Sequence, residues 1–562
     1  MKASKATAQA RADQWSRRML GTARALMIYG LLLGGALVFS LPFVWMAGTS
    51  MKVDREMFGE DIQLFPMRPI PAEQSPYLDD RFFAIPESER YKRVRPEIER
   101  ILQAIEFDLA EYVHGQDQLV QLLIPGIYRR LDQIMPRTLW QADDETLFAA
   151  IQQRVTDDMA QDMVTRLLRR LTFGSIRVRS VDLQEVDLTA DTNPAELWEL
   201  EGPARWSEDG RDAHLVYDFS ARDTGEIRIS ATLKLPFDAE RLQRTMLFIR
   251  PDDSWHALRF SVEKNGVRYR AQRPEYMGDF QWSAVTLQEY GPDDQSTRIR
   301  TWIPYRRAAE GPEYESRPDH IRITMVLTES DQRTAWWAKA QRNYRGALDY
   351  IPFWRYTATS IFLVIMNIIG NIFSCSLVAY AFARLQWPGR NLTFGIMLAT
   401  LMIPPQVTMI PHFLIIRSLG WYNTLYPLWV ISFFGNAFNI FLLRQFMKGI
   451  PRDLEDAAKI DGCNFLQIYW YVIMPLIKPT LACISIFTFM MVWNDFMGPL
   501  IYLSDQRLYP LSLGLYAFNV QAGDNLGMMM AGSLLMTVPV IVIFFFAQKY
   551  FIQGVTLTGM KG

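Results

Sequence analysis

Residues 449–479 read GIPRDLEDAAKIDGCNFLQIYWYVIMPLIKP, and this stretch decides how the surrounding chain is interpreted. Residues 453–458 combine helix formers with acidic side chains near the start, where the helix dipole favours negative charge. Gly462 then ends or bends this helix. Pro475 and Pro479 lie where the next long apolar run begins. The pattern predicts a short amphipathic helix between two membrane spans that docks into a groove on a partner. A plain surface connector is the alternative.

Long intervals without charged residues flank this stretch on both sides. Each is longer than the ~20 apolar residues that span a bilayer core, and a soluble helix of this length would show a charged face. The sequence therefore predicts six membrane-spanning helices, with Asp495 as the one acidic residue inside a span. The intervals are bounded by residues 24 and 52, 355 and 384, 390 and 417, 417 and 444, 478 and 505, and 524 and 549.

The overall composition conceals these spans. The 562 residues include 59 Lys and Arg against 60 Asp and Glu, and the mean hydropathy is near zero. Balanced charge argues against a nucleic-acid binder, whose phosphate contacts need a basic excess. Three cysteines are too few for a disulfide scaffold. The averages mix apolar spans with a strongly charged segment, so they do not indicate a soluble protein.

The charge distribution predicts a multi-pass protein of the cell (inner) membrane with both termini in the cytoplasm, because basic residues favour the cytoplasmic side. The expected parts are a cytoplasmic N-terminus at 1–24, a first transmembrane helix at 25–50, an extracytoplasmic insert at 52–350, a core with helices 2–6 at 354–549, a cytoplasmic loop at 444–478 within that core, and a cytoplasmic C-terminus at 550–562.

The insert divides into two kinds of pattern. Between about 60 and 180, apolar residues recur at helical spacing, which predicts amphipathic helices near 96–114, 117–130 and 144–171. Between about 185 and 340 the period changes to two, which predicts a β-sandwich, and Asn265-Gly266 has the chemistry of a tight hairpin turn. Four tryptophans of this part either stack on sugar rings or fill the core: Trp206, Trp255, Trp282 and Trp302.

Residues 449–479 resemble the EAA loop of ABC importer permeases, in which Glu-Ala-Ala is followed by a glycine and later by an apolar residue, a leucine and a proline. In that family the loop carries the helix that sits in a cleft of the ATP-hydrolysing subunit. The resemblance implies this coupling role, with an aspartate in place of the usual glutamate, for Asp456, Ala457, Ala458, Asp461, Gly462 and Pro475.

Further motifs extend the resemblance to the carbohydrate-importer branch, which includes the second membrane subunit of the maltose permease. These are LPFVWM at 41–46, IPPQV at 403–407, FLLRQF at 441–446, WNDF at 493–496 and FIQGVTLTGMKG at 551–562. The fold implied is an α-helical type I ABC importer permease of six helices, here with a large α+β insert between helices 1 and 2. Two departures are Thr359, where an Asn commonly opens the second span, and the insert itself.

The resemblance also implies the partners: ABC ATPase subunits, a second permease subunit and an extracytoplasmic solute-binding protein, all around a chain embedded in membrane lipid. The chain contains no G-x-x-x-x-G-K-[ST] sequence and hence no phosphate-binding loop of this kind. We expect a transport subunit without catalytic residues, metal site or cofactor, with ATP used by the partner subunits. No nucleic-acid partner is expected.

The solute pathway is predicted from polar residues within the apolar intervals. Ionisable residues and amides at membrane depth face a polar cavity or contact a neighbouring helix. The candidates for contact with the hydroxyl groups of a sugar are Asn436, Asn439, Trp493, Asn494 and Asp495. For each of them a purely structural role is the alternative.

A rival interpretation is a membrane-anchored extracytoplasmic protein that binds or hydrolyses glycans. Acidic residues are plentiful in the insert, but the sequence does not identify a pair ~5–9 Å apart, as glycosidases require. This rival explains neither the loop at 449–479 nor the C-terminal motif.

Overall fold

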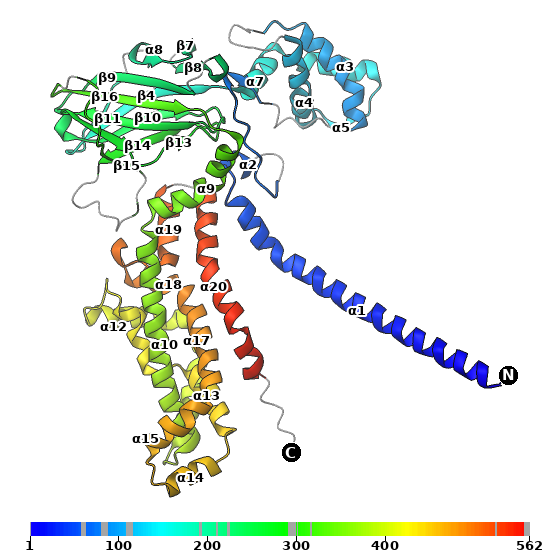
Figure 1. Ribbon diagram of the computed structural model, residues 1–562, viewed down its shortest axis with the longest axis vertical. Coiled ribbons are helices and arrows are strands. Elements are labelled where there is room, and N and C mark those ends of the chain that lie inside the picture. The colour runs from blue at the N-terminus through cyan, green and yellow to red at the C-terminus, as the bar shows by residue number, and fades with distance from the viewer. Residues whose placement is uncertain are drawn as a thin grey trace. The chain divides into compact units, whose positions relative to one another are not determined.

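The computed structural model describes the backbone of residues 2–57, 63–79, 88–107, 116–189, 194–209, 212–221, 225–289, 299, 302–314, 317–522 and 525–555. Two compact units make up the chain (Figure 1). The first comprises Met1–Pro66, Thr297–Ile299 and Asn343–Gly562, and the second comprises Met67–Ser296 and Arg300–Arg342. The first unit is helical and the second holds the strands, so we describe each by itself.

Four helical segments of the first unit are long and apolar enough to cross a membrane: Arg24–Thr49, Phe353–Arg384, Val430–Lys448 and Leu526–Gln548. Two bent pairs would raise the number to six if each pair is one span. Among the described residues, the structure thus gives between four and six crossings, and six stays a prediction. The main helices are α1 (Lys2–Thr49), α10 (Phe353–Arg384), α11 (Arg390–Ala399), α12 (Pro405–Ser418), α13 (Ala437–Lys448), α17 (Lys478–Trp493), α18 (Met497–Tyr502), α19 (Leu511–Ala522) and α20 (Leu526–Val555), with short α2 (Asp54–Met57) and α15 (Phe465–Gln467).

The bends occur where prolines interrupt the helices. Arg390–Met402 and Pro405–Ser418 meet at 100° around Pro404, whose missing N–H and fixed φ prevent the helix from continuing. Phe465–Leu476 and Lys478–Trp493 meet at 76°, next to a π-helical segment, Ile468–Ile473. Pro539 lies inside α20, which continues through it.

Helix α10 is the centre of the first unit and packs against α13 and α17, while α17 also packs against α20 (Figure 1). Gly370 of α10 allows a close approach of the 3₁₀ segment η5 (Val430–Phe434), since a Cβ there would lie 2.7 Å from the Phe433 ring. All three cysteines of the chain belong to this unit: Cys375, Cys463 and Cys483.

The second unit begins with a helical layer around its own apolar core. The predicted helix at 144–171 is wrong as a single element, because Thr156 caps a new helix and strands begin at Leu168. Residues 108–114 of the first predicted helix lie outside the described part of the chain. The layer consists of α3 (Glu89–Gln103), α4 (Gln116–Ile134), α5 (Arg137–Trp140), α6 (Asp144–Arg154) and α7 (Asp157–Leu167).

Most described strands of the second unit form one continuous sheet that folds back on itself, while β2 (Tyr77–Leu78) and β3 (Leu168–Arg169) pair as a separate two-stranded sheet. Strand order is β1-β8-β4-β10-β14-β15-β12-β11-β16-β9-β6, and apolar residues of both halves share one core. The main strands are β4 (Leu171–Ser180), β7 (Ala204–Asp209), β8 (Asp212–Asp218), β9 (Glu226–Lys234), β10 (Leu242–Arg250), β11 (Ala257–Lys264), β12 (Val267–Ala271), β14 (Ser283–Glu289), β15 (Ile303–Arg307) and β16 (His320–Thr328), with short β1 (Gln74–Ser75), β5 (Glu185–Asp187), β6 (Glu199–Glu201) and β13 (Glu275–Tyr276) at the margins.

The structure agrees with some of the predictions made for this region and differs from others. The β-rich character of this region is confirmed, and so is the hairpin turn, since Asn265 and Gly266 both have positive φ between β11 and β12. Of the four tryptophans, Trp255 and Trp302 are buried, and Trp206 packs against the core. Trp282 alone of these four is exposed, by 46%. The pattern did not predict β4 or β10, which lie side by side in the sheet.

Candidate functional site

The loop at 449–479 contains a short helix, α14 (Asp453–Ile460), with two different faces. Glu455 and Ala458 are buried against the first unit. Asp456, Ala457 and Asp461 are exposed, as are several large apolar side chains in or next to the helix. These are Leu454, Ile460, Phe465 and Leu466, which are between 45% and 87% exposed. The loop therefore presents a mixed apolar and acidic surface, while its other face is held in place.

A buried ion pair holds α14 to the end of α10. The Nε atom of Arg384 lies 2.8 Å from Oε1 of Glu455, and both side chains are less than 10% exposed. The two atoms are not aligned as a hydrogen bond, so the attraction is mainly coulombic. Arg384 also donates hydrogen bonds to the backbone oxygens of Met447 and Ile450. One guanidinium thus joins the ends of α10, α13 and α14.

Gly462 ends α14 in a left-handed conformation, with φ of +85°. The Gly462 N–H donates to the Lys459 oxygen and the Cys463 N–H donates to the Ala458 oxygen. This is the Schellman arrangement, which satisfies carbonyls that the helix end leaves unpaired. A Cβ at Gly462 would meet no atom within 4 Å, so the requirement for glycine comes from the backbone alone.

The other motif residues are solvent-facing. Asp456 lies 2.8 Å from Lys459 Nζ, and this hydrogen bond lowers the pKa of the Asp456 carboxyl, so the exposed carboxylate stays ionised. Pro475 is exposed in a short turn of helix, α16 (Met474–Leu476), just after the π-helical segment.

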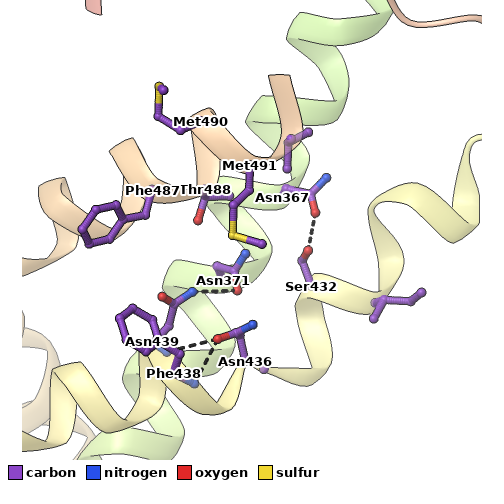
Figure 2. Close-up of a pocket in the computed structure, with 13 residues that line it drawn as sticks. Asn367, Asn371, Ser432, Asn436, Phe438, Asn439, Phe487, Thr488, Met490 and Met491 are labelled. Carbon is purple, nitrogen blue, oxygen red and sulfur yellow. Dashed lines mark hydrogen bonds between the residues drawn. The ribbon is translucent and has the colours of Figure 1, made fainter. Parts of the chain in front are cut away.

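A cavity of about 530 Å³ opens in the middle of the first unit (Figure 2). Its walls come from α10, η5, the start of α13 and α17. Four asparagines and two hydroxyl residues form its polar side: Asn367, Asn371, Asn436, Asn439, Ser432 and Thr488. Of the five residues predicted for a solute pathway, Asn436 and Asn439 therefore line this cavity.

The amides of the cavity hold one another in place. Asn439 Nδ2 donates to Asn371 Oδ1 at 3.4 Å, and the Oδ1 of Asn436 caps α13 by accepting from the N–H of Asn439 at 3.1 Å (Figure 2). Ser432 donates to Asn367 Oδ1. Within the described residues, the structure gives no protein acceptor for Nδ2 of Asn371 or Asn436. These two amide groups are therefore available to a ligand.

The rest of the cavity lining is mainly apolar. Phe438 lies beside Asn436 and Asn439 at the start of α13, whereas Phe487, Met490 and Met491 come from α17, and of these the Met491 thioether points toward Asn371 (Figure 2). A volume of this size falls within the ~300–1,000 Å³ of small-molecule sites. Amide and apolar groups in one cavity match a molecule with hydroxyl groups on its edges and C–H groups on its faces.

The other three predicted pathway residues have different surroundings. Trp493 is buried, donates from Nε1 to the Met536 oxygen and stacks on Phe489. Asn494 is exposed and bonds to the Met490 oxygen of its own helix. The Asp495 carboxylate accepts from the N–H of Gly498 at the start of α18. None of the three is among the residues that line the cavity.

The family described as "Binding-protein-dependent transport system inner membrane component" matches residues 375–557. The arabinooligosaccharides transport system permease protein AraQ of Halalkalibacterium halodurans is 34% identical over 210 residues, which cover 37% of this chain and 75% of AraQ. The chain belongs to this family of ABC importer permeases. This permease is thus a multi-pass membrane protein and a transport subunit, because ABC importers carry their ATPase in separate subunits.

A second curated relative of the permease agrees with this assignment. The diacetylchitobiose uptake system permease protein DasC of Streptomyces coelicolor is 31% identical, and the match covers 39% of this chain and 80% of DasC. A crystal structure of a bacterial ABC transporter involved in the import of the acidic polysaccharide alginate is 30% identical over 37% of this chain and 79% of that chain, with a TM-score of 0.33.

The matched region of the permease includes α14 and the cavity residues from Ile431 onward. Asn367 and Asn371 precede it, and the sequence analysis missed both. Their signal was present, because two asparagines four residues apart in an apolar run lie on one helix face. The second unit lies entirely outside the family match.

Proposed function

We propose that this permease carries a sugar or oligosaccharide through the cavity lined by the four asparagines. The cavity is the observation that carries the proposal, because amides both donate to and accept from hydroxyl groups, while aromatic and thioether groups contact the C–H faces of a sugar ring. The names of the relatives support the substrate class, since AraQ and DasC belong to uptake systems for oligosaccharides.

The exposed surface of α14 is the proposed contact with the ATPase subunit. Asp456, Ala457 and Asp461 lie on this surface together with the exposed apolar side chains around them. ATP bound and hydrolysed by the partner subunits would move α14 and the helices joined to it by Arg384, which changes the side of the membrane to which the cavity opens. The chain itself needs no cofactor in this scheme.

The remaining proposals concern partners and orientation. A second permease subunit completes the pathway, and an extracytoplasmic solute-binding protein delivers the sugar. Basic residues at the inner connections, including Arg384, Arg390 and Arg444, support cytoplasmic termini and an extracytoplasmic insert. The insert, on the extracytoplasmic side in this orientation, is the proposed platform for the solute-binding protein. The C-terminal residues 556–562 lie outside the described part of the chain.

Replacement of cavity amides is expected to weaken sugar transport. Asn371→Leu and Asn439→Leu each remove one hydrogen-bonding side chain at nearly constant volume, and a hydrogen bond is worth ~1–1.5 kcal/mol. We expect each change to raise the sugar concentration for half-maximal uptake about 10-fold. The measurement is ATP-driven uptake of labelled oligosaccharides into proteoliposomes that contain the assembled transporter.

Asn494→Leu is the matched control for this experiment. It removes an exposed amide outside the cavity, so uptake should stay within about twofold of the wild type. If Asn494→Leu weakens uptake as much as the two cavity changes, or if the cavity changes have no effect, the solute does not pass along these amides.

Assembly gives a separate test of the proposed partners. Affinity purification of the intact permease from its native membrane should recover an ATPase subunit and a second permease subunit. An exposed-surface change such as Ile460→Asp should reduce recovery of the ATPase subunit, because it places a charge on the apolar part of the docking surface. Recovery of the intact chain without any ATPase subunit would contradict the proposed role of α14.

A further inference from the structure

Three cations gather where α11 begins and α13 ends in the first unit. Arg390 is the first residue of α11, and Arg444 and Lys448 lie one turn apart at the end of α13. The positive charges of Arg390 and Arg444 both act on Lys448, and the charge of Arg390 also acts on Arg444, so the three side chains lie close together. We name them the α11–α13 cation cluster.

The acidic residues of the neighbouring helix α14 do not neutralise this cluster. Glu455 pairs with Arg384, and Asp456 pairs with Lys459. Neither Asp453 nor Asp461 is among the charges that act on Arg444 or Lys448. The segment 385–389, which leads into α11, contains no acidic residue. Within the described part of the chain, the cluster therefore carries a positive charge that no carboxylate offsets.

Neutral groups hold the two guanidinium groups in place. Arg444 lies 3.8 Å from the centre of the Phe394 ring and donates from Nε to the Phe382 oxygen at 3.3 Å. Arg390 donates to the Leu385 oxygen at 3.0 Å. An aromatic ring and two carbonyl oxygens fix the geometry without removing the charge. The cluster is thus preorganised to meet an anion.

The helix dipoles explain part of the cluster but not all of it. Arg444 and Lys448 lie at the C-terminal end of α13, where cations complement the negative end of the dipole. Arg390 lies at the N-terminal end of α11, where its charge adds to the positive end, and Gly389 before it provides no side-chain cap. An anion at this position would be favoured both by the cations and by the helix N-terminus.

The cluster lies where apolar segments end. The candidate span Val430–Lys448 ends at a residue of the cluster, and the bent pair that starts with Arg390–Met402 begins at another. Trp387, just before α11, is 37% exposed, as is typical of aromatic residues at a membrane interface. Leu392 and Ile396, four residues apart on one face of α11, are 71% and 60% exposed. An apolar surface therefore begins next to the cations.

We propose that the α11–α13 cation cluster binds the headgroup of one anionic phospholipid, whose acyl chains lie along the exposed face of α11. Phosphate oxygens accept charged hydrogen bonds from guanidinium and ammonium groups, and basic pockets between membrane helices bind anionic headgroups. The apolar face favours a lipid over an acidic protein surface, because a protein that met only the cations would leave Leu392 and Ile396 uncovered.

This site goes beyond the proposed transport function and does not depend on it. The cations of the cluster are not among the residues that line the cavity. Lipid binding can therefore be measured on the permease alone, without sugar, ATP or the partner subunits.

The test uses the purified full-length permease and counts bound lipid molecules by native mass spectrometry. The probes are phosphatidylglycerol and phosphatidylcholine with the same acyl chains. We expect one phosphatidylglycerol molecule to bind with at least about 10-fold higher affinity than phosphatidylcholine, whose own ammonium group opposes the cations. Excess inorganic phosphate should not displace the bound lipid, because it has no acyl chains to cover α11.

Two variants place the lipid at the cluster. Lys448→Gln changes an exposed side chain at the end of α13, and Arg390→Gln removes the charge at the start of α11. Each should weaken phosphatidylglycerol binding about 5-fold. Thermal unfolding will show whether Arg390→Gln loosens the protein, and the exposed position of Lys448 keeps the test valid if it does.

Arg452→Gln is the matched control. Arg452 is an exposed basic residue just before α14 and is not among the charges that act on Arg444 or Lys448. Its replacement removes one positive charge near the cluster but outside it, so binding should equal that of the wild type.

Five results would overturn the proposal. They are equal affinity for the two lipids, unchanged binding by Lys448→Gln and Arg390→Gln, an equal loss in Arg452→Gln, displacement of the lipid by inorganic phosphate, and displacement by the ATPase subunit, which would assign the cations to a protein interface. A failure of sugar uptake in the assembled transporter would contradict the proposed function but leave this binding result unaffected.

Discussion

Replacement of Gly462 by valine is expected to abolish sugar uptake while the permease still inserts into the membrane. A non-glycine residue in the left-handed region costs ~1–2 kcal/mol, and a β-branched residue costs more. Valine would therefore abandon φ of +85° and break the two hydrogen bonds that end α14. Because Gly462 directly follows the exposed acidic and apolar residues of α14, the docking surface would lose its shape. The expected fall in uptake is about 100-fold or more.

Gly420 provides a matched control for this change. It ends α12 with φ of +72°, with no atom within 4 Å of a Cβ, and its hydrogen bonds repeat the pattern seen at Gly462. Gly420→Val should therefore impose a similar backbone strain away from the docking surface and leave uptake within a few-fold of the wild type. Recovery of the ATPase subunit on affinity purification should fall only for Gly462→Val. If both variants lose uptake equally, strain and not coupling explains the loss.

Replacement of Glu455 by alanine is expected to detach α14 and to destabilise the first unit. The change leaves the buried guanidinium of Arg384 without its counter-charge, and removal of one partner of a buried ion pair costs ~3–5 kcal/mol. We expect a large drop in the temperature of thermal unfolding of the purified permease. Uptake should fall with it, because α14 loses the contact that ties it to α10.

Two further variants distinguish a loss of stability from a loss of docking to the ATPase subunit. Asp456→Asn removes a carboxylate that is 61% exposed and pairs with Lys459, so the unfolding temperature should not change, since exposed pairs contribute little. The double change of Arg384→Met and Glu455→Met removes both buried charges and should recover much of the lost stability. An unfolding temperature of Glu455→Ala equal to that of the wild type would show that the pair does not anchor α14.

The parts of the permease that could be predicted from sequence are those in which local chemistry decides the structure. Asp453–Ile460 forms a helix because its residues favour one, and Gly462 ends it because no other residue adopts its conformation at low cost. Asn265-Gly266 makes a hairpin for the same reason. Asn436 and Asn439 were identified because amides are unusual in an apolar run.

The features that escaped prediction depend on contacts distant in sequence. The spacing of Asn367 and Asn371 marks one face of α10, but which groups that face meets depends on the packing of α10 against α13 and α17. Asp495 is the only acid of its apolar interval, and its carboxylate accepts from the N–H of Gly498 near the start of α18, which is the structural alternative that the sequence left open. Strand β10 was missed because Met246 and Phe248 occupy outward positions, which hides the alternation of a half-buried strand.

The residues that line the cavity include none whose charge changes between about pH 5 and 8. The lining residues therefore offer no group that binds a proton. They also include no charged side chain on which the membrane potential could act. A cavity of this composition offers no titratable side chain through which solute movement could be linked to a proton gradient. In the proposed scheme the driving force for uphill transport comes from the ATPase subunits, and α14 with its buried anchor receives it as a mechanical input.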